Sequence, residues 1–212
     1  MRATRPVPTL AEPFEEADRQ HEAMLFGLWL FLATEILFFG GFFFLYAVAR
    51  LQDPIGFAAG GHKANLLLGT INTVLLMSSS ATLTIAERAI QAEWRRAARI
   101  GIVATLVLGT AFLAVKGFEY REDLTEHLFP PMPAFPFAAV GAVRFWSFYW
   151  TITIIHAIHL TIGLAFVARL LWLDRQAQLG PRWMTAEVTT LYWHLVDIVW
   201  LLVWPLLYLV GR

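Results

Sequence analysis

Long apolar stretches alternate with short polar connections along this chain, and each stretch is long enough to cross a lipid bilayer. The first runs from Met24 to Ala49 and carries a single ionisable residue, Glu35. A hydrocarbon core of about 30 Å takes about twenty helical residues. The pattern therefore predicts an all-α, polytopic membrane protein: a bundle of five transmembrane helices at about 23–50, 65–88, 97–119, 143–173 and 185–210.

Sequence breaks separate these predicted spans. Asp53-Pro54 follows the first, a proline-rich loop at 130–136 precedes the fourth, and Gly180-Pro181 precedes the fifth. Proline and glycine in such pairs favour turns over continued helix. An odd number of spans places the two chain termini on opposite sides of the membrane.

Composition supports a membrane protein and excludes several functions. Of the 212 residues, 58% are hydrophobic and only 15% are charged, with a mean hydropathy of +0.59. A soluble domain would carry about a quarter charged residues. The formal net charge is zero, which provides no basic surface for nucleic acid. The chain has no cysteine, which excludes disulfides and cysteine-based nucleophiles or iron–sulfur ligands.

The distribution of Lys and Arg favours one orientation. Residues 1–22 lack the apolar core and cleavage site of a secretory signal, so we expect a short N-terminal tail there and a transmembrane domain over 23–212. The tail and the connections after the second and fourth spans hold ten Lys and Arg residues, whereas the opposite side holds six. The positive-inside rule therefore predicts a cytoplasmic N-terminus and an external C-terminus.

Glu35 lies near the middle of the first span, where inserting an ionisable group costs on the order of 3 kcal/mol. A rise of 1.5 Å per residue places it roughly 16 Å from the start of its span and His159 roughly 21 Å from the outer end of the fourth, antiparallel span. In a core of about 30 Å these depths agree to within about a turn. A Glu35–His159 hydrogen bond is therefore permitted, although depth does not establish that the two helices are neighbours.

His156 and His159 stand three residues apart, so both project to neighbouring parts of one helix face. Such a pair could ligate a metal or haem, or each ring could hydrogen-bond to a buried acceptor. The fourth span carries no Cys, Asp or Glu beside them, and one helix seldom supplies a whole metal site. We favour the hydrogen-bonding role and predict no metal site.

The second and fifth spans carry further polar groups. Gly69, Thr73, Ser80 and Thr84 follow one face of the second span, which favours close helix packing with interhelical hydrogen bonds over a polar pathway. The fifth span carries a stripe that must face protein or water rather than lipid tails. We expect this stripe to serve in docking and internal bracing, with a proton relay as the alternative: Glu187, His194 and Asp197.

Five blocks of sequence, in order, resemble subunit III of haem–copper terminal oxidases, the cytochrome c oxidase subunit III family. They are LWLFLATEILFFGGFFFLY, INTVLLMSSSATLT, GFEYRE, SFYWTITIIHAIHLTIG and YWHLVDIVW, and they cover most of residues 25–204. Family members commonly have seven spans. This chain therefore resembles a five-span form without the first two helices, which in related oxidases can be fused to subunit I.

The resemblance implies a non-catalytic core subunit of an oxygen-reducing cytochrome c or quinol oxidase in a bacterial cytoplasmic membrane. Subunits I and II would be its protein partners and would hold the haem and copper, so this chain would have no active site or metal of its own. It would bind structural phospholipid in a cleft between helix groups. It would also sustain proton uptake for proton translocation and protect the enzyme from turnover-linked inactivation during aerobic electron transport.

The resemblance also assigns roles to individual residues. Glu35 matches the family's intramembrane carboxylate, which reacts with carbodiimides, and His159 matches the second histidine of the family's H-G-x-H, which pairs with that carboxylate. The chain departs from this motif at Ile155 and Ala157, where glycines are usual around His156. These larger side chains place close helix contact at that point in doubt, but not the histidine positions.

The remaining matched positions are polar and are expected to brace the helices or dock against partners: Glu119 and Tyr120 of the family's E-Y, and Glu187, His194 and Asp197 of its last-helix pattern. Arg182 and Trp183 are candidates for binding a lipid head group. That expectation rests only on their place at the predicted membrane border.

Three alternatives remain open from the sequence. An accessory homologue associated with nitric oxide reductase would share the same blocks. A stand-alone haem-b membrane protein would take its ligands from His156, His159 and His194. A proton-conducting transporter would use Glu35 and the stripe of the fifth span, although the internal repeats and broken helices common in transporters are not evident.

Overall fold

In the computed structural model, residues 16–179 and 183–209 are described, and they form six α-helices and no strand. Five of these helices are long and apolar enough to cross a membrane, which confirms the predicted all-α architecture. The helices are α1 (Ala17–Gln52), α2 (Pro54–Gly61), α3 (Leu66–Gln91), α4 (Arg95–Thr125), α5 (Val140–Arg175) and α6 (Trp183–Tyr208).

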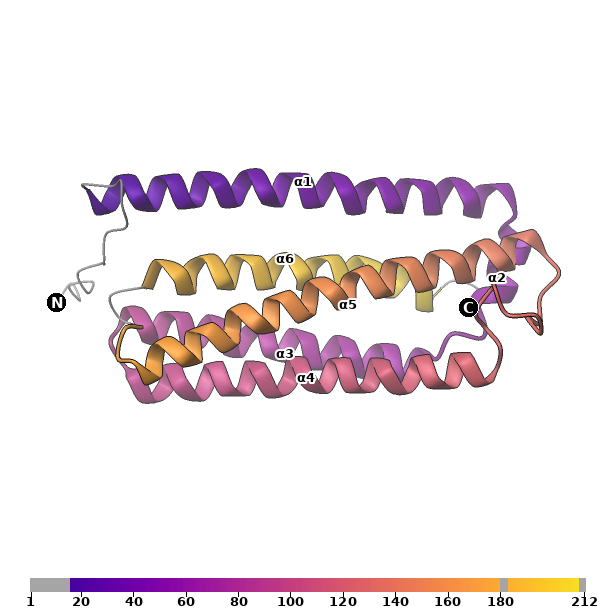
Figure 1. Cartoon of the computed structure of the whole chain (residues 1–212). Helices are drawn as coiled ribbons and strands as arrows, with labels where there is room; N and C mark the ends of the chain where they lie inside the picture. Colours follow the sequence, from indigo (N-terminus) through magenta and orange to yellow (C-terminus); the bar gives the residue numbers. More distant parts are fainter. Residues whose placement is uncertain (1–15, 180–182, 210–212) are drawn as a thin grey trace.

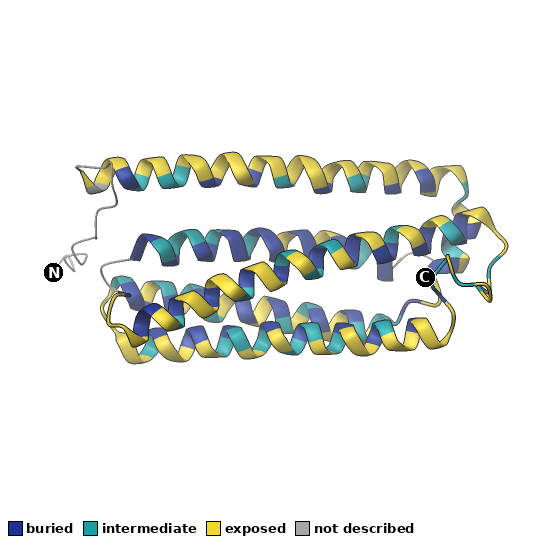
Figure 2. Ribbon diagram, viewed as in Figure 1, coloured by how far each residue is buried: buried dark blue, intermediate teal, exposed yellow. Residues whose placement is uncertain are grey.

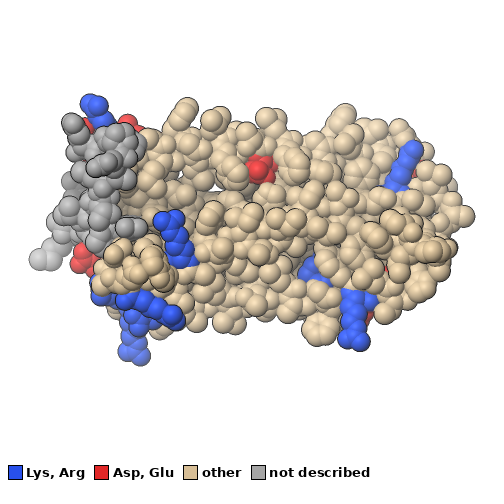
Figure 3. Space-filling view, in the orientation of Figure 1, with Lys and Arg blue, Asp and Glu red and all other residues tan. Residues whose placement is uncertain are grey.

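The five long helices run alternately up and down (Figure 1). The end of the bundle where α1 begins is called the N-side end, and the end where α6 finishes is called the C-side end. Lys and Arg side chains lie towards these two ends on the face shown in Figure 3, and a small acidic patch lies over the middle of α1. Helix α1 begins at Ala17, so the end of the tail predicted at 1–22 is helical.

Helix α1 lies along one edge of the bundle, where it packs against α5, α6 and α2 (Figure 1). Its buried side chains include Leu28, Leu32, Phe39 and Tyr46, which are separated by four or seven residues and so lie on one face of the helix. Glu35 falls in the same stripe, between Leu32 and Phe39. The rest of the helix is mostly exposed and apolar (Figure 2). In a membrane this surface suits lipid or a partner subunit.

The core lies among α3, α4, α5 and α6 and is filled largely by aromatic side chains: Trp146, Tyr149, Trp193, Trp200 and Tyr208 are fully buried. Glycines let these helices approach closely, as small residues do in membrane bundles. At Gly101 on α4, an added Cβ would lie 2.7 Å from the carbonyl oxygen of Thr82 on α3. Helices α3 and α4 are therefore closely packed at Gly101, whereas the small-residue face predicted for the second span packs on α6, where an added Cβ at Gly69 would lie 2.8 Å from the ring of Tyr208.

The short helix α2 was not predicted from the sequence, which indicated only a break at Asp53-Pro54. The side chain of Asp53 accepts a hydrogen bond from the backbone N–H of Gly56 at 3.0 Å and caps α2. Its other carboxylate oxygen accepts from the N–H of Gly141 at 2.8 Å, in the first turn of α5. Aspartate followed by proline is a known helix start. Phe57 of α2 is completely buried and seals the C-side end of the bundle.

Candidate functional site

Glu35 and His159 meet between α1 and α5. Nε2 of His159 lies 3.1 Å from Oε2 of Glu35, and both side chains are more than four-fifths buried. The separation is that of an ion pair, but the ring is not aligned for a hydrogen bond, and Oε2 has no hydrogen-bond partner elsewhere in the described residues. The edge of the Phe39 ring packs against the imidazole. The structure therefore brings together a pair that depth along the helices permitted and the resemblance to the family implied.

The second ring nitrogen of His159 determines how this pair holds its proton. Nδ1 lies 2.8 Å from the backbone carbonyl oxygen of Ile155. A carbonyl oxygen only accepts hydrogen bonds, so Nδ1 carries a hydrogen. Nε2 then faces Glu35 either as part of an imidazolium beside a carboxylate or as a lone pair beside a carboxylic acid. In both of these states the pair is neutral overall, which lowers the cost of burying it.

His156 does not share the surroundings of His159. Its ring is 1% exposed and packs between Phe112 and Trp200, with centroid distances of 5.7 Å and 5.1 Å. Neither ring nitrogen has a hydrogen-bond partner within the described part of the chain. The hydrogen-bonding role expected for His156 is therefore not observed among these residues. Residues 16–179 and 183–209 also contain no group of three or more His, Cys, Asp or Glu placed to hold a metal ion.

The residues of the polar stripe of α6 contact different helices. Glu187 forms an ion pair with His21 of α1 at 2.8 Å. His194 contacts two hydroxyls of α3, with Nδ1 2.7 Å from Ser80 and Nε2 3.3 Å from Thr84. These contacts confirm the interhelical hydrogen bonds expected of the second span.

Asp197, the last member of this stripe, is 4% exposed; its carboxylate makes no hydrogen bond of standard geometry among the described residues, but the Ser80 hydroxyl that contacts His194 also interacts with it. Glu187 and His194 of the stripe therefore brace α6 against α1 and α3.

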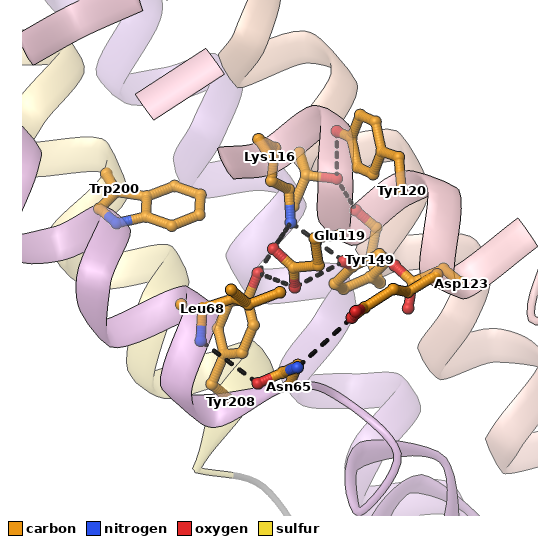
Figure 4. Close-up of polar contacts among 12 residues, drawn as sticks. Asn65, Leu68, Lys116, Glu119, Tyr120, Asp123, Tyr149, Trp200 and Tyr208 are labelled. Atoms are coloured by element: carbon orange, nitrogen blue, oxygen red, sulfur yellow. Dashed lines mark hydrogen bonds and ion pairs between the residues drawn. The ribbon is translucent and has the colours of Figure 1, made fainter. Parts of the chain in front are cut away.

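Glu119 and Tyr120 belong to a larger cluster that the sequence analysis did not find (Figure 4). Nζ of Lys116 lies 3.0 Å from Oε2 of Glu119, and both side chains are at most 2% exposed. The hydroxyl of Tyr120 donates to Thr153 at 2.9 Å, and its ring centroid is 5.0 Å from Nζ. The other members are Asp123 of α4, Tyr149 of α5 and Tyr208 of α6. A signal did exist, because Lys116, Glu119 and Asp123 are spaced to share one helix face.

The two predicted lipid head-group residues are only partly accounted for. Trp183 is the first residue of α6 and is buried, with its indole 5.1 Å from the ring of His21. Arg182 lies outside the described residues. A lipid role for this position stays a prediction.

Comparison with known proteins identifies the family. Residues 16–212 match the family model described as cytochrome c oxidase subunit III. The chain is 30% identical to cytochrome c oxidase subunit 3 of Synechocystis over 202 residues, which are 92% of this chain and 80% of that protein. It is 28% identical to cytochrome bo(3) ubiquinol oxidase subunit 3 of Pseudomonas aeruginosa, over 92% of this chain and 90% of that protein.

A third relative joins two subunits in one chain. The haem–copper oxidase subunit I+III of Aeropyrum pernix is 30% identical over 191 residues, which are 86% of this chain but 22% of that longer protein. The same family is indicated by the ordered sequence blocks, the five long helices and the match over residues 16–212. This chain therefore belongs to the cytochrome c oxidase subunit III family and is subunit III of a haem–copper terminal oxidase.

Proposed function

We propose that this subunit packs against the catalytic subunit I, carries no redox centre itself, and sustains proton uptake and turnover stability. The observation that supports this most is the inward pairing of Glu35 with His159. The ionisable group in the middle of α1 braces two helices and does not line an open polar route. Any part that this chain has in proton uptake is then indirect, through the shape it gives the complex.

The fused relative supports a place beside subunit I. In the protein named subunit I+III from Aeropyrum pernix, the region similar to this chain is part of one polypeptide with subunit I. The mostly exposed, apolar surface of α1 offers a large face for such a contact. We also propose that subunit II is a partner. The subunit would lie in a bacterial cytoplasmic membrane, with its N-terminus in the cytoplasm and its C-terminus outside.

A stand-alone haem-b protein fits these side chains poorly. Both ring nitrogens of His194 already contact hydroxyls, and the ring of His156 is enclosed by aromatic residues of α4 and α6. Nδ1 of His159 donates to a backbone carbonyl and Nε2 faces Glu35. These three rings have different neighbours and do not converge on one space.

Bound phospholipid is the second part of the proposal. An apolar groove of about 350 Å³ lies between α3 and α4 at the N-side end, lined by Ile85, Ala89 and Ala92, with Arg88 and Trp94 at its rim. An acyl chain suits the apolar lining, and a guanidinium suits a lipid phosphate. Tryptophan is enriched at this depth of the membrane.

The test is to purify the intact complex and the complex from which this subunit has been removed. We expect equal haem content per catalytic subunit and a similar initial rate of oxygen reduction. The depleted complex should take up protons more slowly and should inactivate after fewer turnovers. Adding the subunit back should restore both properties. Loss of haem from the depleted complex would contradict the proposal and would indicate a role in cofactor assembly.

A further inference from the structure

A closed ionic cluster lies in the C-side half of the bundle, apart from the Glu35–His159 pair. It contains Lys116, Glu119 and Asp123 from successive turns of α4, Tyr149 from α5 and Tyr208 from α6 (Figure 4). Lys116 is 2% exposed, Glu119 1% and Asp123 5%, and the two tyrosines are fully buried. One cation and two carboxylates are thus enclosed where water cannot screen them.

The ammonium group of Lys116 has a hydrogen-bond acceptor for each of its three hydrogens. Its Nζ contacts Oε2 of Glu119 at 3.0 Å, the hydroxyl of Tyr149 at 3.0 Å and the hydroxyl of Tyr208 at 2.7 Å. An ammonium group has three hydrogens, one for each of these acceptors. Tyr208, having accepted from Lys116, donates its own hydrogen to Oε1 of Glu119 at 2.7 Å.

The hydroxyl of Tyr149 contacts two carboxyl groups but has only one hydrogen to donate. Its hydroxyl oxygen accepts from Nζ of Lys116 and lies 2.9 Å from Oε1 of Glu119 and 2.7 Å from Oδ2 of Asp123. A phenol has one hydrogen and can donate to only one of the two carboxylates. The other carboxyl group must bring a hydrogen of its own, because two oxygen lone pairs at this separation would repel each other.

Asp123 is the group that brings this hydrogen. Glu119 already receives hydrogen bonds from Lys116 and Tyr208, which stabilise its ionised form. Within the cluster Asp123 contacts only Tyr149. A proton on Asp123 leaves one ammonium and one carboxylate, so the cluster is neutral, and an uncompensated buried charge is avoided.

We propose that Asp123 is a buried proton-binding site of this subunit, occupied in the resting state and coupled to Glu119 through Tyr149. In the coupled step, the acid proton of Asp123 passes to the Tyr149 oxygen as the phenolic proton of Tyr149 passes to Oε1 of Glu119. Tyr149 is unchanged, Asp123 becomes a carboxylate and Glu119 a carboxylic acid. The net charge stays the same, so the site can hold its proton at either carboxyl group.

The site lies close to the aqueous end of α4. That helix ends at Thr125, and both Glu122 on its last turn and Glu126 immediately after it are exposed. Glu126 forms an exposed ion pair with Lys63 at 3.0 Å, and Glu122 lies 3.5 Å from the side-chain amide of Asn65. Asp123 thus lies within one helical turn of exposed carboxylates, so the C-side end is the aqueous surface nearest to it along α4.

The test compares Asp123→Asn with Glu119→Gln in the intact oxidase complex by infrared difference spectroscopy and thermal inactivation. Asp123→Asn should assemble with an unchanged inactivation half-life, because a neutral amide can donate to Tyr149 as the neutral acid does. It should also remove one carbonyl band of a protonated carboxyl group. Glu119→Gln should shorten the half-life by more than about tenfold, because the ammonium of Lys116 loses the one carboxylate in direct contact with it and Asp123 is linked to it only through Tyr149.

Three results would overturn the proposal. The first is a carboxylic-acid band that persists in Asp123→Asn. The second is Asp123→Asn failing to assemble while Glu119→Gln assembles normally, which would reverse the two assignments. The third is equal half-lives for the two variants, which would mean that the two carboxyl groups do not differ in charge. Tyr149→Phe provides a further check, since removal of the hydroxyl must shift the Asp123 band.

Discussion

Nε2 of His159 lies 3.1 Å from Oε2 of Glu35, which places an ionisable contact in the middle of α1, between the buried Leu32 and Phe39. Helix association inside a membrane gains little from the hydrophobic effect, since lipid tails are as apolar as leucine. A polar contact of this kind therefore has a large influence on where α1 packs. We expect the attachment of α1 to α5 to depend on it.

Glu35→Gln should leave the complex assembled, because an amide N–H can donate to the unprotonated Nε2 of His159. Glu35→Leu should destabilise it by about 1–3 kcal/mol, because His159 loses its partner in a buried place. The half-life of the detergent-solubilised complex at a fixed temperature is the measurement. If the complex with Glu35→Leu has the same half-life as wild type, the pair does not stabilise the packing of α1 on α5.

The double variant Glu35→Leu/His159→Leu separates the pair from general packing. Replacing both partners by apolar groups of similar size can be nearly neutral. The double variant should therefore be more stable than Glu35→Leu alone. If the double variant loses as much stability as the two single variants together, the two residues act independently.

Close packing of α4 on α3 depends on Gly101. An alanine Cβ there would lie 2.7 Å from the carbonyl oxygen of Thr82 and 2.8 Å from Cβ of Ala86, so the helices must move apart. We expect Gly101→Ala to cost about 1–3 kcal/mol, in the range of other overpacking substitutions. The unfolding midpoint of the complex in a denaturing detergent is the measurement.

Gly117→Ala is the matched control in the same helix, since nothing lies within 4 Å of its added Cβ. It should be neutral or stabilising by up to about 1 kcal/mol, because alanine favours helix. Equal changes in stability at the two positions would mean that helix propensity, and not contact with α3, determines the effect of alanine.

Asp53 connects the start of α2 to the start of α5 through its two carboxylate oxygens. Asp53→Ala should remove both caps and cost about 2 kcal/mol. Asp53→Asn keeps one acceptor oxygen and should cost less. Hydrogen exchange at the amides of Gly56 and Gly141 should accelerate in the alanine variant at both sites. Acceleration at Gly56 alone would refute the link to α5.

The proposed lipid groove makes a separate prediction about Arg88. Arg88→Gln keeps a long polar side chain but removes the charge that would bind a lipid phosphate. We expect less phospholipid to co-purify with the complex, as counted by mass spectrometry of extracted lipid. Arg175→Gln, at the same end of the bundle on α5 but outside this groove, is the control. Equal lipid loss in both variants would indicate a general effect of surface charge.

The long helices could be predicted because the membrane requires each span to be long, apolar and helical. Depth along those helices permitted His159 as the partner of Glu35, and the resemblance to the family assigned that pairing. The short helix α2 was missed because a break between spans and a helix start share the same residues at Asp53-Pro54. Its role is tertiary, since Asp53 also binds Gly141, which lies in the first turn of α5.

The cluster around Lys116 was missed for a different reason. The apolar run before Lys116 predicts a third span that ends at about residue 119, whereas α4 continues to Thr125 and Lys116 is buried. Its acceptors include Tyr149 and Tyr208, on helices α5 and α6. The spacing of Lys116, Glu119 and Asp123 indicated a shared face, but no sequence pattern showed which helices would cover it.

The most direct test of the account is purification of this subunit, through an affinity tag, from its native membranes in a mild detergent. We predict that a haem- and copper-bearing catalytic subunit of an oxygen reductase co-purifies and gives the complex its visible spectrum. When the complex is then dissociated, the tagged, folded subunit should be colourless. A haem spectrum retained by the separated subunit, or a nitric oxide reductase as the co-purifying enzyme, would contradict the account.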